Sequence, residues 1–177
     1  VYSGEVEHRD SAGGGGKIGP GDVQWMTAAS GLVHEEKHGA DFSKNGGLFE
    51  MVQLWVNLPA KDKMTKPRYQ GLLNKNIPRV ELPGDAGSVR VIAGEFKGAK
   101  GPARTFTPID LWDVRVKADR DMVLSLPAGH TAMVFVLEGK LEFEGGNILE
   151  SAELGVLSKE ESDLKLKAFL DSKILFL

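Results

Sequence analysis

The chain has 177 residues, of which 41% are hydrophobic and 27% charged, the mixture of an ordinary folded protein rather than a disordered one. Its formal net charge of -3 gives no broad positive footprint, so no direct nucleic-acid contact is expected. It contains no cysteine, which excludes disulfides, thiolate catalysis and cysteine-based zinc sites and agrees with a cytoplasmic location. No apolar run approaches the length of a bilayer span, so no membrane contact is expected either.

Glycines at short intervals, with short apolar runs between them, predict a mainly β chain. In the first part we expect strands at residues 1–8, 23–27, 32–38 and 48–58. In the last of these strands the apolar side chains recur at every second position and would share one face. The run Gly13–Gly16 predicts a hairpin tip, because it lacks the lysine and the following helix of a phosphate-binding loop.

The polar, proline-punctuated stretch at residues 61–84 reads as a linker, with a short helix around residues 69–74. Beyond it the β pattern resumes at regular spacing, which favours a sandwich or barrel. The strands expected there cover residues 89–93, 110–116, 122–126, 132–137, 140–144, 154–157, 164–168 and 174–177.

The most specific motifs lie in the first half: residues 4–11 (GEVEHRDS), 18–28 (IGPGDVQWMTA), 31–36 (GLVHEE) and 53–58 (QLWVNL), followed by Met64, Pro67 and Tyr69-Gln70. Looser motifs follow at residues 105–108, 126–130 and 137–139. In their order and approximate spacing these motifs closely resemble the pirin family, all-β proteins built from two cupin barrels.

This resemblance implies a bicupin whose first barrel holds a metal ion, usually iron, through three histidines and one glutamate. The matching positions here are His34 and Glu36. The family's His-Pro-His segment would lie upstream of residue 1, and its tail beyond residue 177, so we expect an incomplete first barrel in a fragment or short form. The expected domains are a partial N-terminal cupin at residues 1–60, the linker at 61–84 and a metal-free C-terminal cupin at 85–177.

The residues themselves agree with this pairing. Side chains two apart on a strand point to the same face, so His34 and Glu36 would enter the barrel together. An imidazole and a carboxylate suit Fe(II) or another divalent ion such as Mn, Ni or Zn. Taken alone, His-X-Glu on a strand is more often a surface feature, and the resemblance favours the ligand reading. Because two ligands leave an ion too open, we predict weak or no metal binding by this chain.

Four further side chains bear on the candidate site. His38 shares the parity of His34 and is either a substitute ligand or the solvated start of a loop. His8 is expected to be a surface or hairpin residue rather than a ligand. Trp25 and Trp55 are expected in the core, although either could line the mouth of a pocket. The second cupin carries Ser-Leu-Pro-Ala at residues 125–128 in place of a His-X-His pair, so no metal is expected there.

The resemblance implies quercetin 2,3-dioxygenation as the candidate activity, with a flavonol-like small molecule as substrate. In that reaction Glu36 would be the catalytic residue, taking the proton of the flavonol hydroxyl as well as binding the metal. The alternative is a non-enzymatic regulatory protein that responds to metal or redox state. An incomplete barrel would also expose unpaired strand edges, through which the chain would associate with itself.

Overall fold

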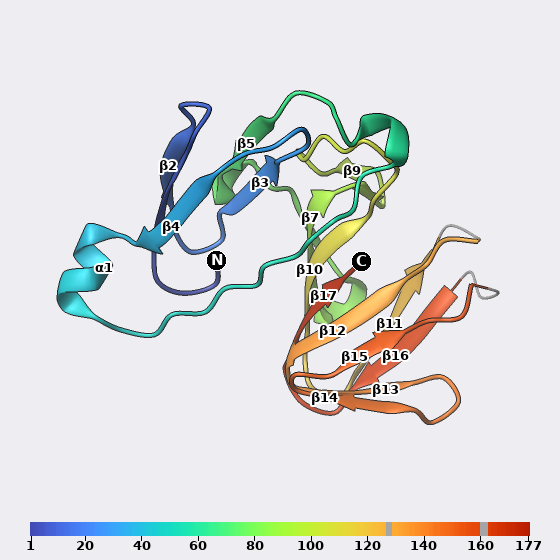
Figure 1. The fold of residues 1–177 in the computed structure, drawn as a ribbon. Coiled ribbons are helices and arrows are strands. Elements are labelled where there is room, and N and C mark those ends of the chain that lie inside the picture. The colour runs from blue at the N-terminus through green and yellow to red at the C-terminus, as the bar shows by residue number, and fades with distance from the viewer. Residues whose placement is uncertain (127–128, 160–162) are drawn as a thin grey trace. The chain divides into compact units, whose positions relative to one another are not determined.

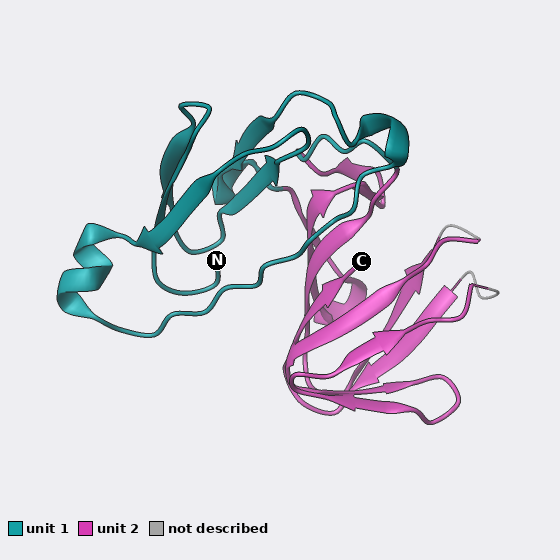
Figure 2. Cartoon of the chain, in the orientation of Figure 1, with its two compact units in different colours: residues 1–77, 103–107 teal, residues 78–102, 108–177 magenta. Residues whose placement is uncertain are grey.

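The computed structural model describes residues 1–126, 129–159 and 163–177. The chain forms two compact units, which Figure 2 shows in different colours. Unit 1 comprises Val1–Ile77 and Ala103–Thr107, and unit 2 comprises Pro78–Pro102 and Pro108–Leu177. The stretch read as a linker, residues 61–84, contributes to both.

Unit 1 contains two small antiparallel sheets (Figure 1), one with the strand order β2-β1-β4 and one formed by β3 and β5. Its strands are β1 (Val6–Asp10), β2 (Gly15–Ile18), β3 (Val23–Thr27), β4 (His34–His38) and β5 (Arg68–Leu72). Its helical elements are α1 (Ala40–Asn45), η1 (Ala60–Asp62) and η2 (Asn74–Asn76).

Three predicted elements of unit 1 are wrong, and β1 begins at Val6 rather than at residue 1. Residues 48–58 form no strand, because the only ladder contact there is an isolated bridge between Ser3 and Glu50. The helix expected at residues 69–74 is largely β5, which pairs along its whole length with β3 and so gains a ladder that local propensity could not reveal. The loop expected after His38 contains α1.

Unit 2 contains a six-stranded sheet of order β15-β12-β17-β10-β7-β6, a four-stranded sheet of order β11-β16-β13-β14, and the hairpin β8-β9. All eight strands expected in this half are confirmed within a few residues at their ends; β6, β8, β9 and β14 were not predicted. The elements are β6 (Arg79–Glu81), η3 (Pro83–Asp85), β7 (Gly87–Ala93), β8 (Glu95–Phe96), β9 (Ala99–Lys100), β10 (Leu111–Val116), β11 (Arg120–Ser125), β12 (Met133–Glu138), β13 (Lys140–Phe143), β14 (Ile148–Glu150), β15 (Leu154–Val156), β16 (Asp163–Ala168) and β17 (Ser172–Phe176).

Alternation explains how these strands bury one face. In β16 exposed and buried residues alternate strictly, and its register places Leu164 opposite Leu124 of β11. One apolar cluster takes side chains from both larger sheets. Within it the ring of Trp112 stacks on Phe176 at 4.9 Å and meets Phe96 edge-on at 5.0 Å. Unit 2 is therefore built around one apolar core, to which both larger sheets contribute side chains.

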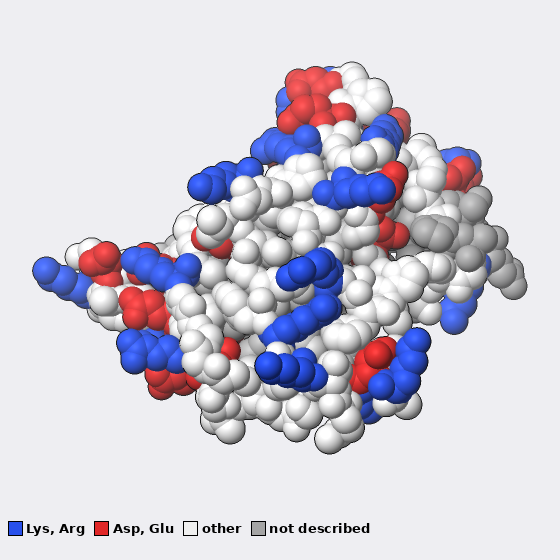
Figure 3. Space-filling view, turned by 90° about the horizontal axis from the view of Figure 1, so that it is seen from above, with Lys and Arg blue, Asp and Glu red and all other residues white. Residues whose placement is uncertain are grey.

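The all-β class is confirmed, since among the described residues α1, six residues long, is the only α-helix. Within that part of the chain no helix is long and apolar enough to cross a membrane. Figure 3 shows both signs of charge on one face of the molecule, separated by broad uncharged areas.

Candidate metal centre

The two predicted ligands lie together on β4. Nδ1 of His34 is 3.9 Å from Oε1 of Glu36, and their side chains are 32% and 26% exposed. This separation follows from the two-residue repeat of the strand, which turns both side chains to one face. The structure thus brings the pair together, while their role as ligands stays a prediction.

Two further ionisable residues stand directly opposite this pair on the neighbouring strand β1. In the β1–β4 register, His8 faces Glu36 and Asp10 faces His34. Residues directly opposite in an antiparallel pair project to the same side of the sheet. His38 follows on the same face of β4, so the sequence places five candidate donors along one face.

His8 lies in the β1–β2 hairpin, as one of the two expectations had it, but it is buried rather than at the surface, with 2% of the residue exposed. Its Nε2 lies 2.7 Å from the hydroxyl of Tyr69, a hydrogen bond, and the two rings are 4.6 Å apart. Gly16 lies opposite His8 on β2, and a Cβ there would only just contact Nε2, at 3.4 Å. The Nε2 atom of His8 is therefore occupied by its hydrogen bond with Tyr69.

Tyr69 brings a further ionisable group toward this face. Burial raises the pKa of its phenol, and the nearby carboxylates of Glu36 and Asp10 raise it further. Its hydroxyl therefore stays protonated at neutral pH and can donate a hydrogen bond. Sequence reasoning missed Tyr69, because its position depends on the pairing of β3 with β5, two strands far apart in the chain.

The position of His8 did have a signal in the sequence. Val6 and His8 are two residues apart on β1, and Val6 is 2% exposed. An apolar residue at that spacing indicates which face of a strand is buried. The spacing of Val6 and His8 therefore indicated that His8 is buried, although the charged residues beside it favoured an exposed position.

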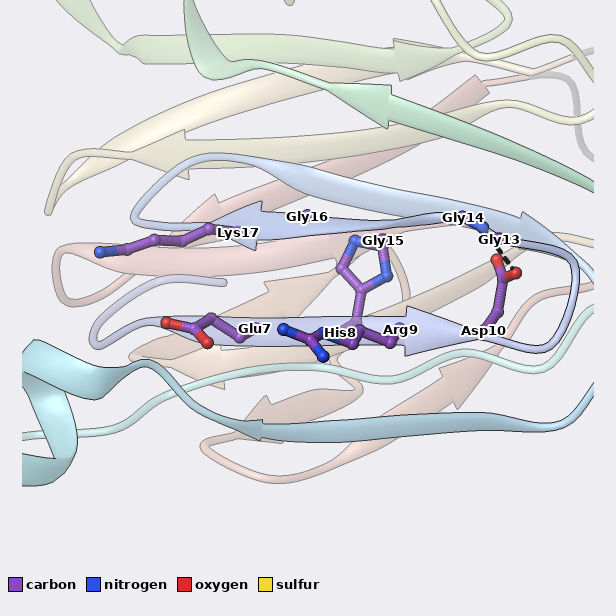
Figure 4. A pocket seen from close by; sticks show the side chains of 9 residues that line it. All are labelled: Glu7, His8, Arg9, Asp10, Gly13, Gly14, Gly15, Gly16 and Lys17. Carbon is purple, nitrogen blue, oxygen red and sulfur yellow. Dashed lines mark hydrogen bonds between the residues drawn. The ribbon is translucent and has the colours of Figure 1, made fainter.

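Asp10 is used by the hairpin turn rather than by the candidate centre. Its Oδ1 accepts hydrogen bonds from the backbone N–H groups of Ala12 and Gly14, each at 2.8 Å. Figure 4 shows this carboxylate turned toward the glycine-rich tip, along the hollow that the β1–β2 hairpin lines. That hollow includes His8 but neither His34 nor Glu36.

His38 is exposed at the end of β4, as expected of a solvated position, but α1 begins two residues later in place of the expected loop. Its ring lies 4.8 Å from that of Phe49 and 5.2 Å from that of Phe42 on α1, so aromatic contacts occupy it. Of the two tryptophans expected in the core, Trp25 is half-buried, and Trp55 is 93% exposed. The core prediction for Trp55 is therefore wrong.

The number of donors on this face decides whether it could hold a metal ion. A protein metal site usually needs three or four protein ligands. His8, Asp10 and His38 are each held by other partners, and only His34 and Glu36 converge. No group of three His, Asp or Glu residues among those described could hold an ion. These residues supply two donors and do not by themselves fit a complete site.

In the second unit, apolar side chains from both larger sheets form one cluster. The motif expected to replace the metal ligands there includes Pro127 and Ala128, which lie outside the described residues. The absence of metal from this unit stays a prediction.

Comparison with known proteins identifies the family. The Pirin model matches residues 1–56, and the model of the Pirin C-terminal cupin domain matches residues 111–177. A Pseudomonas aeruginosa protein named "Putative quercetin 2,3-dioxygenase" is 54% identical over 177 residues, covering 100% of this chain and 62% of that protein. A Thermoplasma acidophilum protein with the same description is 32% identical, covering 98% of this chain and 72% of its own length.

Among solved structures, the quercetin 2,3-dioxygenase of Acinetobacter baumannii superposes with a TM-score of 0.96 at 48% identity. The superposition covers 99% of this chain and 61% of that one, so the chain spans less than two thirds of this relative and of the Pseudomonas protein. With two family models in order along the chain and relatives matched over nearly all of it, this chain belongs to the pirin family of two-cupin proteins.

Proposed function

We propose that this chain carries the His34–Glu36 part of a metal-dependent site for flavonol oxidation of the quercetin 2,3-dioxygenase type. The observation that supports it is the convergence of an imidazole and a carboxylate on β4, 3.9 Å apart and partly open to solvent. The descriptions of both of these relatives name the same reaction. The flavonol class of substrate comes from these names.

Within this proposal Glu36 has the clearest role. An ionised carboxylate within hydrogen-bond reach of the acidic 3-hydroxyl of a flavonol can accept its proton. The His34 imidazole would bind beside it as a neutral ligand or hydrogen-bond partner. A divalent ion, when bound, would supply Lewis acidity and orientation of the substrate. His34 and Glu36 alone would hold that ion incompletely.

The first test is metal binding by the purified chain, measured by elemental analysis and by calorimetric titration with Fe(II), Ni(II) and Zn(II). We expect weak binding that His34→Ala and Glu36→Gln abolish. Glu35→Gln is the matched control, because it removes an adjacent charge of opposite strand parity. Binding that is unaffected by His34→Ala and Glu36→Gln would refute their role as ligands, and stoichiometric iron in the purified chain would refute the prediction of weak binding.

The second test needs no metal. Deprotonation of quercetin shifts its long-wavelength absorption, so binding to Glu36 would be visible as a spectral shift at a pH where free quercetin is protonated. We expect the shift with the wild-type chain and with Glu35→Gln, and its loss with Glu36→Gln. An equal shift with all three would exclude Glu36 as the base. Metal binding without quercetin binding or turnover would instead support the regulatory alternative.

A further inference from the structure

Residues 103–107 form a short strap that belongs to unit 1, although the chain on either side of them belongs to unit 2. Figure 2 gives the strap the colour of unit 1. It lies between β9 and β10 in the chain and contains neither strand nor helix. Its backbone groups therefore depend on partners outside the regular ladders, and those partners show where the strap is attached.

The side chain of Gln70 on β5 pairs with both backbone groups of Arg104 in the strap. Its Oε1 accepts the N–H of Arg104 at 2.9 Å, and its Nε2 donates to the carbonyl oxygen of Arg104 at 3.0 Å. Gln70 is 7% exposed, so water competes little for these bonds. A carboxamide has the donor and the acceptor of a peptide group, and here it takes the place of a neighbouring strand.

A second side chain of β5 contacts the strap. Nη2 of Arg68 donates to the same carbonyl oxygen of Arg104 at 2.9 Å, and the guanidinium carbon of Arg68 lies 4.3 Å from the centre of the Phe106 ring. Arg68 and Gln70 are two residues apart on a strand, so both project from one face of β5. The strap is therefore attached to that face.

The opposite face of β5 leads to the candidate centre. Tyr69 lies between Arg68 and Gln70 and so projects to the other side of the strand. Its hydroxyl makes the 2.7 Å hydrogen bond with Nε2 of His8. His8 stands directly opposite Glu36 in the β1–β4 register, a position in which Cβ atoms are about 4.5–5.5 Å apart. One strand thus connects the strap with the residue beside Glu36.

We propose that the strap positions the candidate centre through β5. Gln70 and Arg68 fix β5 from one face, and Tyr69 carries that position to His8 beside Glu36. The sheet formed by β3 and β5 has only two strands, which by themselves give marginal stability, so packing on its faces decides where β5 lies. Gln70 and Arg68 act through Tyr69 and are positioning residues. The effect on His8 is independent of the proposed function, whereas the effect on metal and flavonol binding rests on it.

The test replaces Gln70 by Met, which keeps the length of the side chain and removes both of its hydrogen-bonding groups. Gln53→Met is the matched control, at an exposed glutamine that makes no hydrogen bond with the strap, all of whose residues the structure describes. Deuterium exchange of the Arg104 N–H, followed by NMR, reports on the strap. The nitrogen resonance of His8 Nε2, assigned with His8→Leu, reports on the opposite face of β5.

We expect Gln70→Met to speed the exchange at Arg104 by about tenfold, because the N–H loses its acceptor. The same variant should move the His8 Nε2 resonance toward its position in Tyr69→Phe. Gln53→Met should change neither. If Gln70→Met folds and leaves the exchange at Arg104 unchanged, Gln70 does not hold the strap. Faster exchange with an unchanged His8 resonance would make the strap a local structural tie. Either result overturns the proposal.

Phe106→Leu is the second variant, made on the strap itself, and it decides the question if Gln70→Met does not fold. It removes the ring beside the Arg68 guanidinium and keeps the backbone bonds of Arg104. We expect a smaller movement of the His8 resonance in the same direction. An unchanged resonance in the folded Phe106→Leu variant would also overturn the proposal.

Metal and quercetin titrations of the same variants separate this inference from the proposed function. Where the wild-type chain binds either one, Gln70→Met should weaken that binding by about 10–100-fold, as the loss of groups that orient a ligand does, and Gln53→Met should not. Equal binding by Gln70→Met and the wild-type chain would refute the positioning role. A wild-type chain that binds neither would refute the proposed function, and the His8 resonance would still decide whether the strap positions this face.

Discussion

The two units turn different kinds of side chain to the faces of their strands. In unit 2, strands from two sheets turn apolar faces to one cluster, whose members include Trp112, Leu124 and Leu141. In unit 1, the fully buried apolar residues are only Val6, Ile18, Leu72 and Ile77 among those described, and a paired sheet face carries histidines and carboxylates. The comparison shows that a strand face can carry apolar or ionisable side chains, and that unit 1, where one paired face carries ionisable residues, buries few apolar side chains among those described.

The largest effect should come from a cavity in the apolar core of unit 2. Leu124 is fully buried on β11, so Leu124→Ala removes apolar contacts and leaves a cavity, at a cost of about 2–5 kcal/mol in the free energy of unfolding. Val123, the next residue on the same strand, is 50% exposed, and Val123→Ala should cost no more than about 0.5 kcal/mol. Urea denaturation measures both. If the two variants lost the same free energy of unfolding, Leu124 would not lie on the packed face of β11.

In unit 1 the corresponding test concerns a polar contact. Tyr69→Phe removes the hydroxyl 2.7 Å from Nε2 of His8 and leaves that buried nitrogen without its partner. We expect a cost of about 1–3 kcal/mol in the free energy of unfolding. In a His8→Leu background the same change should cost clearly less, because no buried nitrogen remains to be satisfied. Equal costs in the two backgrounds, from urea denaturation of all four proteins, would show that the pair is not coupled.

The same contrast explains what the sequence could predict. All eight strands expected in the second half are present, because strict alternation there coincides with burial, as in β16. In unit 1 the alternation at residues 48–58 failed as a predictor, since a strand also needs a partner, and β5 was missed because its partner β3 is distant in the chain. Local periodicity placed His34 beside Glu36. It could not place Tyr69 against His8, which depends on contacts between separate sheets.

The smallest expected effect is a change in the pKa of Tyr69, which depends on the nearby carboxylate of Glu36. Burial and the carboxylate of Glu36 raise the pKa of Tyr69 above its ordinary value of about 10. The raised pKa means that the folded state keeps the phenolic proton at a pH where the unfolded chain has lost it. The resulting stabilisation of the protonated form is present below pH 10 and declines as the pH rises past that value. Absorbance at 295 nm follows the ionisation, and Tyr69→Phe identifies the share of the other tyrosine, Tyr2.

Glu36→Gln should move the Tyr69 midpoint down toward the ordinary value, because it removes the carboxylate that, after burial, does most to raise the pKa of the phenol. Glu35→Gln, which changes a neighbouring carboxylate that does not act on Tyr69, should leave the midpoint where it is. If Glu36→Gln also leaves it unchanged, the carboxylate points away from the phenol. The face shared by β1 and β4 would then be a set of separate polar contacts, and the distinction between a packed unit and a chemical one would rest on His34 and Glu36 alone.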